Sequence, residues 1–318
     1  MPTEFELIAR FFRPEVHHTL LAGGDDAALL VPSPGRQLAV TTDMLVEGVH
    51  FLPGADAEAL GHKVLAVNLS DLAAMGAIPR WVFLGVALPR ADEVWCERFA
   101  RGFLDLARAF DVDLAGGDTT RGPLNLCVTA VGEVEPGLAL RRSGARPGDD
   151  IWLTGTTGEA AFGLQCCLGA TAGAHPVAVS RCRQRLERPW PRVAFGREAL
   201  GLATAAIDVS DGLVADLGHV CAASGVGAVI DWDRLPQSSA LAGLEPVRRQ
   251  ELVLSGGDDY ELVLTAPPGA RSALLAAADR CDTPLARIGS VQEGRGVAVR
   301  DRDGRMLPLA RTGFDHFA

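Results

Sequence analysis

Residues 65–77 carry apolar side chains at nearly every position of a predicted helix. A helix that is apolar on all sides is buried. Asp71 is the one ionisable residue of this stretch, and no basic residue lies one helical turn away on either side. A buried carboxylate must be paired, protonated or bound to a cation. Asp71 therefore needs a partner from elsewhere in the chain, either a cation or, for a purely structural Asp, an Arg or a backbone amide.

Alternating strand and helix patterns fill the first 140 residues. Apolar periodicity predicts helices at 4–12, 57–76 and 95–110 and strands at 38–43, 81–88 and 126–134. Gly76 and Pro79 give the usual stop signals after the second helix. The glycine-rich run 114–122 is predicted to be a turn.

A stretch rich in Gly, Pro and Arg, residues 136–149, interrupts this rhythm. We place a domain boundary there, with domains at 1–140 and 141–318. The second half then predicts strands at 151–154, 205–209, 227–231 and 262–265, helices at 192–202 and 213–223 and one ending near 278, and a hairpin at Asp303-Gly304.

Two features of the second half have competing interpretations. The strand–glycine–helix unit at 151–158 could hold a phosphate at the helix N-terminus, although many α/β turns look the same. The arginine-rich run 181–192 is predicted to be a solvated helix end.

Composition and charge narrow the class of protein. A chain of 318 residues with 48% hydrophobic residues can bury a large core. The net charge of −10 argues against a nucleic-acid surface, so a bound phosphate would need cations. The N-terminus lacks the apolar core of a signal peptide and no apolar run is long enough to span a bilayer. Seven cysteines without Cys-x-x-Cys spacing indicate reduced thiols, and we expect a cytoplasmic protein.

Acidic residues beside Gly, Ser or Thr recur along the chain, and we expect them to form one site around Asp71. They are Asp25, Asp26, Asp43, Asp118, Asp208, Asp211, Asp258 and Asp259. Mg²⁺ is usually held by one or two carboxylates together with substrate phosphates, so this many acids predicts several Mg²⁺ ions around a polyphosphate. Thiol and imidazole ligands are missing from these turns, which disfavours zinc. Ser210 or Asp211 could equally well be a simple helix cap.

The sequence has neither a Gly-x-x-x-x-Gly-Lys-Ser/Thr loop nor a dinucleotide fingerprint. A nucleotide would then be held through metal ions. Phosphoryl transfer depends on positioning and charge neutralisation, so it requires no nucleophilic Ser or Cys, and no convincing triad is found.

These motifs together resemble the thiamine-monophosphate kinase family. The matching segments are Gly24-Asp-Asp-Ala, Thr41-Thr-Asp43-Met-Leu-Val-Glu-Gly-Val-His50-Phe, Asn68-Leu-Ser-Asp71-Leu-Ala-Ala-Met-Gly-Ala, Gly116-Gly-Asp118-Thr-Thr-Arg-Gly, Arg142-Ser-Gly-Ala, Ile207-Asp-Val-Ser-Asp211-Gly-Leu, Ser255-Gly-Gly-Asp258-Asp-Tyr-Glu-Leu and Gly313-Phe314-Asp-His-Phe. The resemblance is collinear from residue 4 to the C-terminus. One departure concerns Asp258, where the family often has Glu.

The resemblance implies an α/β N-terminal domain with a mixed sheet, an α+β C-terminal domain of the aminoimidazole-ribonucleotide-synthetase type, and a homodimer formed through the N-terminal sheets. It implies transfer of the ATP γ-phosphoryl to thiamine monophosphate. By matching position, the magnesium shell is Asp26, Thr41, Thr42, Asp43, Asp71, Asp118, Asp208 and Asp211. The implied ATP contacts are Gly117, Asp118, Arg142 and Ser210, and the implied thiamine-phosphate contacts are His50, Asp258 and Phe314.

Two other functions are compatible with an acidic, nucleotide-binding site. One is another ATP-using enzyme of the same superfamily. The missing Cys near the N-terminus argues against its selenium chemistry, and the His50 and Phe314 motifs argue against its purine chemistry. The other is a non-catalytic nucleotide or metal sensor. Turnover of ATP with thiamine monophosphate separates all three, because only the kinase makes thiamine diphosphate.

Overall fold

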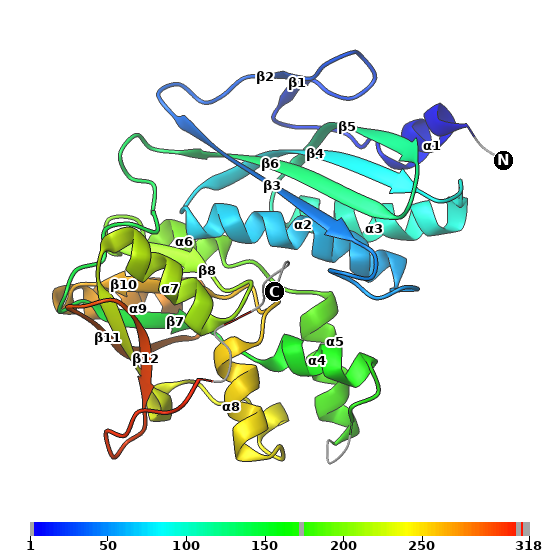
Figure 1. Cartoon of the computed structure of the whole chain (residues 1–318). Coiled ribbons are helices and arrows are strands. Elements are labelled where there is room, and N and C mark those ends of the chain that lie inside the picture. Colours follow the sequence, from blue (N-terminus) through cyan, green and yellow to red (C-terminus); the bar gives the residue numbers. More distant parts are fainter. Residues whose placement is uncertain (1–2, 172–174, 310–312, 314–318) are drawn as a thin grey trace. The chain divides into compact units, whose positions relative to one another are not determined.

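The computed structural model describes residues 3–171, 175–309 and 313 and divides into two compact units (Figure 1). Unit 1 comprises residues 1–72 and 77–137, and unit 2 comprises residues 73–76 and 138–318. Both are mixed α/β structures, so the predicted fold class is confirmed.

Unit 1 is a four-stranded sheet with helices along one face (Figure 1). Its elements are α1 (Glu4–Phe11), β1 (Thr19–Leu21), β2 (Leu29–Leu30), β3 (Gln37–Val46), α2 (Ala57–Ala74), β4 (Ile78–Leu88), α3 (Glu93–Ala109), β5 (Asp113–Arg121) and β6 (Asn125–Val134). The strand order is β3-β6-β4-β5, with β4 and β5 parallel and the other neighbours antiparallel. All six predicted helices and strands of the first half are present.

Helix α2 is buried, as its uniform apolarity predicts. Val64, Leu65 and Leu69 are fully enclosed. Glycines let α2 and α3 touch backbone to backbone, because a Cβ built on Gly61 would lie 2.1 Å from the Phe99 carbonyl oxygen and one on Gly102 would lie 1.8 Å from that of Glu58. The helix that carries Asp71 is therefore fixed at close range.

The glycine-rich run 114–122 forms strand β5, so its prediction as a turn was wrong. Gly117 has φ +154°, and a Cβ there would lie 2.0 Å from the Leu84 carbonyl oxygen. The pairing of β5 with β4 also shifts register between Val82 and Phe83. The glycines allow close contact between backbones and a bulge within the sheet. A run of glycines in a sequence is equally typical of a turn, so the sequence alone does not distinguish the two.

Unit 2 is built on a six-stranded sheet of order β12-β9-β11-β7-β10-β8. Its strands are β7 (Asp150–Thr154), β8 (Ala205–Asp208), β9 (Gly227–Asp231), β10 (Leu262–Ala266), β11 (Leu285–Gln292) and β12 (Gly296–Arg300). Its helices are α4 (Glu159–Cys167), α5 (Pro176–Glu187), α6 (Val193–Glu198), α7 (Leu213–Ser224), α8 (Pro246–Ser255) and α9 (Arg271–Arg280), with short 3-10 turns at Trp232–Arg234, Ser239–Leu241 and Pro268–Ala270.

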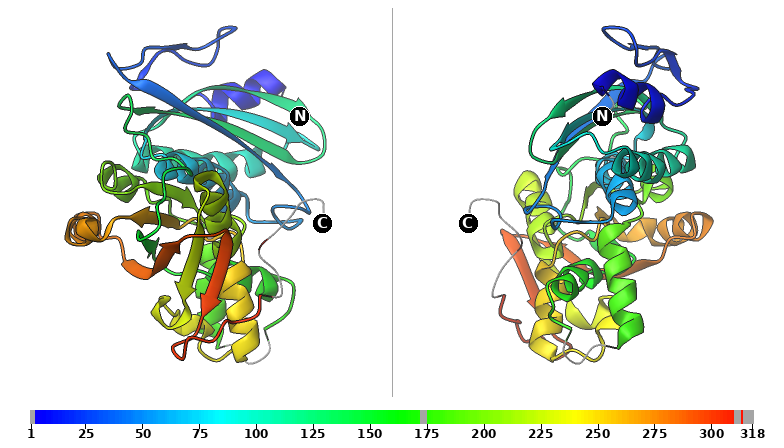
Figure 2. Two further views of the ribbon diagram at one scale, coloured as in Figure 1. Left: turned by 60° about the vertical axis from the view of Figure 1, so that its left-hand side comes forward. Right: turned by 90° about the vertical axis from the view of Figure 1, so that its right-hand side faces the viewer.

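Helix α4 packs against α5 and α8 (Figure 2). Helix α8 was not predicted, although Pro246 at its first turn is a common start signal. The ends of three strands define the functional edge of this sheet. The register pairs Leu262 with Asp208 and Val263 with Leu153, so the carboxyl ends of β7 and β8 and the start of β10 lie together.

Two helical glycines should respond to Ala in opposite directions. Gly102→Ala forces a methyl group into the Glu58 carbonyl and should destabilise the protein by about 1–3 kcal/mol. Gly218→Ala, in α7 with nothing within 4 Å of the new Cβ, should stabilise it by about 0.5–1 kcal/mol through helix propensity. Urea unfolding of both variants measures the difference, and equal effects would contradict close α2–α3 packing.

Candidate active site

Thr41, Asp43 and Asp71 come together between β3 and α2. The Thr41 hydroxyl donates to Asp71 Oδ2 at 2.5 Å, and the Asp43 backbone N–H donates to Asn68 Oδ1 at 3.2 Å. Burial, together with the nearby charge of Asp71, raises the pKa of Asp43 to about 7. Two half-buried carboxylates and a hydroxyl are hard oxygen donors of the kind that Mg²⁺ prefers.

Two of the other predicted side chains of unit 1, Thr42 and Asp118, lie on the opposite face of the sheet. The Thr42 hydroxyl shares a hydrogen bond with Thr129 at 2.9 Å, on the face away from Thr41 and Asp43. Asp118 is exposed on β5 and pairs in register with Gly85, which in turn pairs with Cys127 on that same outer face. The Thr42 hydroxyl therefore does not join the Asp43–Asp71 pair, and only the main chain of Thr42 could do so.

The loop that bears Asp26 lies on this outer side as well. A Cβ on Gly23 would be 3.8 Å from Gly116 Cα in β5, and Asp26 itself is exposed. His50 follows β3 in a turn, where its Nδ1 accepts the Val46 backbone N–H at 3.0 Å. The expectation of one site around Asp71 is thus met only in part within unit 1, because a sheet separates two groups of acids.

In unit 2, the turn after β8 carries Asp208, Ser210 and Asp211. Neither Ser210 nor Asp211 caps α7. Instead, Asp216 from inside the helix accepts the backbone N–H groups of Ser210, Asp211 and Gly212 at 3.0, 3.0 and 3.1 Å. Burial, and then the charge of Asp211, raises the pKa of Asp216 to about 7.

A second loop, residues 255–261, is bonded to this turn through the backbone. The Asp258 N–H donates to the Ser210 carbonyl and the Tyr260 N–H to the Val209 carbonyl, both at 2.8 Å. Asp258 and Tyr260 have φ values of +68° and +50°, which side chains rarely adopt. The Tyr260 hydroxyl donates to Asp258 Oδ1 at 3.1 Å. Asp208, Ser210, Asp211 and Asp258 are therefore brought to one edge of the sheet.

Asp259, next to Asp258, turns inward and is 2% exposed. Its carboxylate accepts the N–H groups of Gly158 at 2.7 Å and Ala160 at 3.4 Å. Burial raises the pKa of Asp259 well above its usual value. The Gly158 and Ala160 N–H groups at this helix N-terminus thus bond to a protein carboxylate, which disfavours the phosphate cradle that the sequence left open.

The arginine-rich run is also not a simple solvated helix end. Arg192 forms a two-pronged pair with Glu261 at 2.7 Å, and Arg185 adds a third contact at 2.7 Å. Burial alone would raise the pKa of Glu261, but its arginine partners lower it overall. A buried charge such as Glu261 needs such partners. The high charge of residues 181–192 suggested exposure to solvent and gave no sign of this buried pairing.

Sequence reasoning missed Asp216, Glu261, Arg185 and Arg192 as supports of the acidic turns. For Asp216 a signal was present, because it is an acid among the apolar residues at the start of α7, as Asp71 is an acid among the apolar residues of α2. The partners of Glu261 lie about 70 residues earlier in the chain, and no local pattern predicts such a pair.

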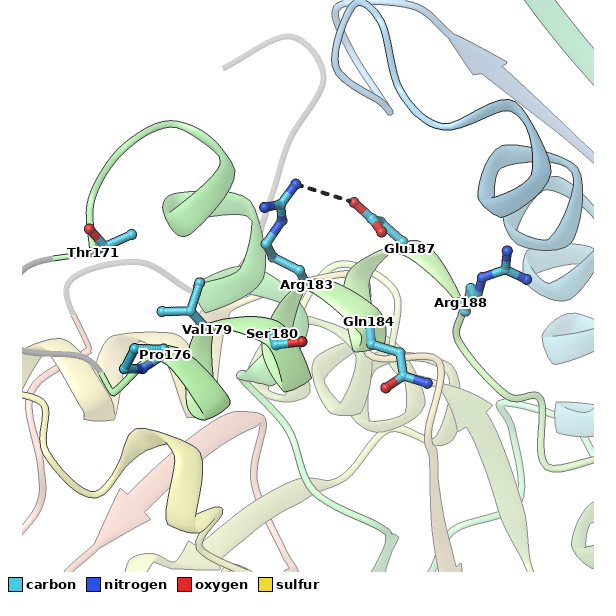
Figure 3. A pocket seen from close by; sticks show the side chains of 8 residues that line it. All are labelled: Thr171, Pro176, Val179, Ser180, Arg183, Gln184, Glu187 and Arg188. Carbon is cyan, nitrogen blue, oxygen red and sulfur yellow. Dashed lines mark ion pairs between the residues drawn. The ribbon is translucent and has the colours of Figure 1, made fainter. Parts of the chain in front are cut away.

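The remaining predicted residues are placed as follows. Gly117 and Arg142 are exposed, and Phe314 lies outside the described residues. A cavity of about 760 Å³ runs along α5, lined by Thr171, Pro176, Val179, Ser180, Arg183, Gln184, Glu187 and Arg188 (Figure 3). None of the predicted site residues lines it.

Over residues 3–171, 175–309 and 313, no three His, Cys, Asp or Glu side chains cluster closely enough to hold a metal ion. The acids occur in smaller groups, such as Asp43 with Asp71. The Asp43–Asp71 pair suits Mg²⁺, which commonly takes one or two carboxylates and completes its shell with water and phosphate oxygens.

The Asp43–Asp71 pair predicts a pH-dependent stability. A folded-state pKa near 7 against an unfolded value of 3.8 means that the folded protein binds the extra proton between these values. The free energy of unfolding therefore falls as pH rises through this window. Asp71→Asn removes one charge. In chelator at pH 7.5 this variant should therefore melt at the same temperature as the natural protein or at a higher one. Its melting temperature should also fall less than that of the natural protein between pH 5 and pH 7.5.

Asp113→Asn is the control with the opposite sign. Burial opposes ionisation of Asp113, but hydrogen bonds from His17, Thr19 and His18 lower its pKa overall, so its loss should destabilise the protein at pH 7.5. A large fall in melting temperature for Asp71→Asn would instead identify Asp71 as a structural carboxylate.

Comparison with known proteins identifies the family of this chain. The AIR synthase related protein family matches the chain twice, with its N-terminal domain at residues 24–134 and its C-terminal domain at residues 146–302. Thiamine-monophosphate kinase of Escherichia coli (strain K12) is 45% identical over 319 residues, covering 99% of this chain and 98% of that protein.

Solved structures agree over nearly the whole length. Thiamine-monophosphate kinase from Stenotrophomonas maltophilia K279a has a TM-score of 0.85 at 49% identity, with 95% of each chain covered. AaThiL complexed with AMPPCP and TMP has a TM-score of 0.77 at 32% identity, with 98% of this chain and 96% of that chain covered. The chain therefore belongs to the thiamine-monophosphate kinase family of AIR synthase related proteins.

Proposed function

We propose that this protein transfers the γ-phosphoryl group of ATP to thiamine monophosphate and forms thiamine diphosphate. The observation that carries the proposal is the full-length relationship to AaThiL, which was solved with AMPPCP and TMP. The acidic turns agree with it, because phosphoryl transfer needs charge neutralisation and positioning. The attacking oxygen belongs to the substrate phosphate, so no covalent intermediate on the protein is needed.

Several Mg²⁺ ions are part of this proposal. The oxygen donors that would hold them are Asp26, Thr41, Asp43, Asp71, Asp118, Asp208 and Asp211, with the main chain of Thr42. Bound there, Mg²⁺ would neutralise phosphate charge and orient the γ-phosphoryl group. The support in this chain is the close Asp43–Asp71 pair, whose mutual repulsion a cation would relieve.

The chain's own residues would divide the two substrates between them. Gly117, Asp118, Arg142 and Ser210 are proposed to bind ATP, and the exposed Arg142 guanidinium suits a phosphate. His50, Asp258 and Phe314 are proposed to bind thiamine monophosphate. Residues 1–140 would then form the ATP, Mg²⁺ and dimerisation domain, and residues 141–318 would complete the site.

We further propose a homodimer formed through the outer face of the unit 1 sheet. Val40 and Met44 of β3 are 63% and 54% exposed on this face, and Thr42 lies between them. Helices α2 and α3 cover the other face only (Figure 1). An exposed apolar stripe on an edge strand is a typical interface. Asp26 and Asp118 lie on this side and would therefore face a second copy.

No helix of the described chain is long and apolar enough to cross a membrane. We propose a cytoplasmic location on the separate ground of the reduced cysteines expected from the sequence.

The kinase assignment predicts a specific product. Chromatography should detect thiamine diphosphate when the purified protein is given ATP, Mg²⁺ and thiamine monophosphate, and none in chelator. Thiamine should be a very poor acceptor because it lacks the attacking phosphate. Asp71→Asn should lower turnover roughly a hundredfold or more, as when a preorganised charge partner is removed. Comparable rates with thiamine and its monophosphate would reject the assignment.

The dimer proposal predicts that Val40→Asp yields a monomer, because a symmetric interface would bury two new carboxylates. Sedimentation velocity measures the change. Val247→Asp is the matched control, since Val247 is 70% exposed on α8 and should leave the mass unchanged. A Val40→Asp protein that stays dimeric would place the interface elsewhere.

A further inference from the structure

One oxygen atom organises the turn that follows β8. Asp216 Oδ2 accepts three successive backbone N–H groups, those of residues 210 to 212, and the Asp216 side chain is 2% exposed. Successive N–H groups that converge ahead of a helix make an anion-binding concavity. In many proteins a phosphate would occupy that position. Here the protein supplies the anion itself.

The N-terminus of α4 follows the same rule. The N–H groups of Gly158 and Ala160 converge on Asp259 rather than on solvent. Both glycine-bearing turns that could bind phosphate through main-chain amides are therefore filled by buried carboxylates. A polyphosphate that approaches this edge meets acidic side chains, and the N–H groups of residues 158, 160 and 210 to 212 are already bonded to protein carboxylates.

The contacts of Asp216 reach residues that are proposed to bind Mg²⁺ or ATP and also one that is proposed to bind thiamine monophosphate. Ser210 and Asp211 are held directly through their N–H groups. The Ser210 carbonyl then accepts the Asp258 N–H at 2.8 Å, and a Cβ on Gly257 would lie 2.4 Å from this carbonyl oxygen. A displacement of Ser210 would therefore move Asp258 as well.

We propose that Asp216 is a positioning residue of the phosphoryl-transfer site, an internal anion that fixes Ser210, Asp211 and Asp258 and makes nucleotide binding at this edge depend on divalent cations. This inference rests on the proposed function. The Asp216 carboxylate acts in two ways. Its Oδ2 occupies the amides that would otherwise hold a phosphate directly, and in its ionised form it adds negative potential behind Asp211, which favours a divalent cation there.

The test is Mg²⁺-dependent binding of a non-hydrolysable ATP analogue, measured by calorimetry over a range of free Mg²⁺. Asp216→Asn keeps the volume and one acceptor oxygen but removes the charge. We expect the Mg²⁺ concentration for half-maximal binding to rise roughly tenfold, because one nearby charge is lost from the cation's surroundings. Asp149→Asn is the matched control. Asp149 is 4% exposed and accepts the Arg146 N–H and the Thr204 hydroxyl at the opposite end of the sheet, so its Mg²⁺ dependence should stay unchanged.

A second measurement needs no nucleotide. In chelator, inorganic phosphate should not raise the melting temperature of the natural protein, whereas it should raise that of Asp216→Ala, whose vacated amides become a phosphate site. An Asp216→Asn protein with a lower melting temperature but natural Mg²⁺ dependence would overturn the proposal, and so would phosphate binding by the natural protein without metal. If Asp216→Ala does not fold, the Mg²⁺ dependence of Asp216→Asn and phosphate binding by the natural protein in chelator still test the proposal.

These outcomes are separate from the kinase assignment. Failure to form thiamine diphosphate with the natural protein would reject the proposed function while leaving the cation dependence of nucleotide binding measurable.

Discussion

Electrostatic repulsion between carboxylates is the constraint on which the rest of this structure depends. The candidate site gathers acids in partly buried turns, where each raises the free energy of its neighbour's charged form. Burial, and then the neighbouring charges of Asp71 and Asp211, raise the pKa values of Asp43 and Asp216. Without cations, such turns hold their shape only if other parts of the fold fix them.

The two units fix their acids by different means. In unit 1, glycines bring backbones into contact, so that α2 sits tightly on α3 and the position of Asp71 follows from helix packing. In unit 2, the support is electrostatic. Glu261, almost fully buried, takes Arg192 and Arg185, and this pair anchors the end of the loop that presents Asp258. Breaking such a buried pair typically costs about 3–5 kcal/mol. The two arginines therefore stabilise the loop through Glu261, although they lie in another part of the chain.

The sequence predicted most of the strands and helices, because their apolar periodicity is strong, and it identified Asp71 from its contrast with an apolar helix. It also placed Asp208, Ser210, Asp211 and Asp258 in turns that the structure brings to one sheet edge. What the sequence left undetermined has a common physical cause. Which face of the sheet Thr42 and Asp118 occupy depends on register, and which of Asp258 and Asp259 points outward depends on backbone dihedrals. Neither property is encoded in residue type alone. The strand β5 was mistaken for a turn for the same reason, since glycine serves both.

The inward turn of Asp259 shows how the backbone assigns different roles to adjacent, identical residues. The left-handed conformations at Asp258 and Tyr260 reverse the chain on both sides of Asp259, so that its carboxylate enters the interior while that of Asp258 stays at the edge. Asp258 has a shorter side chain than the Glu often found in this family, and the Tyr260 hydroxyl holds one of its oxygens at 3.1 Å. A short acid with few rotatable bonds, fixed by a phenol and by the Ser210 carbonyl, loses little further entropy on binding a ligand. Preorganisation thus offsets the reach lost by the shorter side chain.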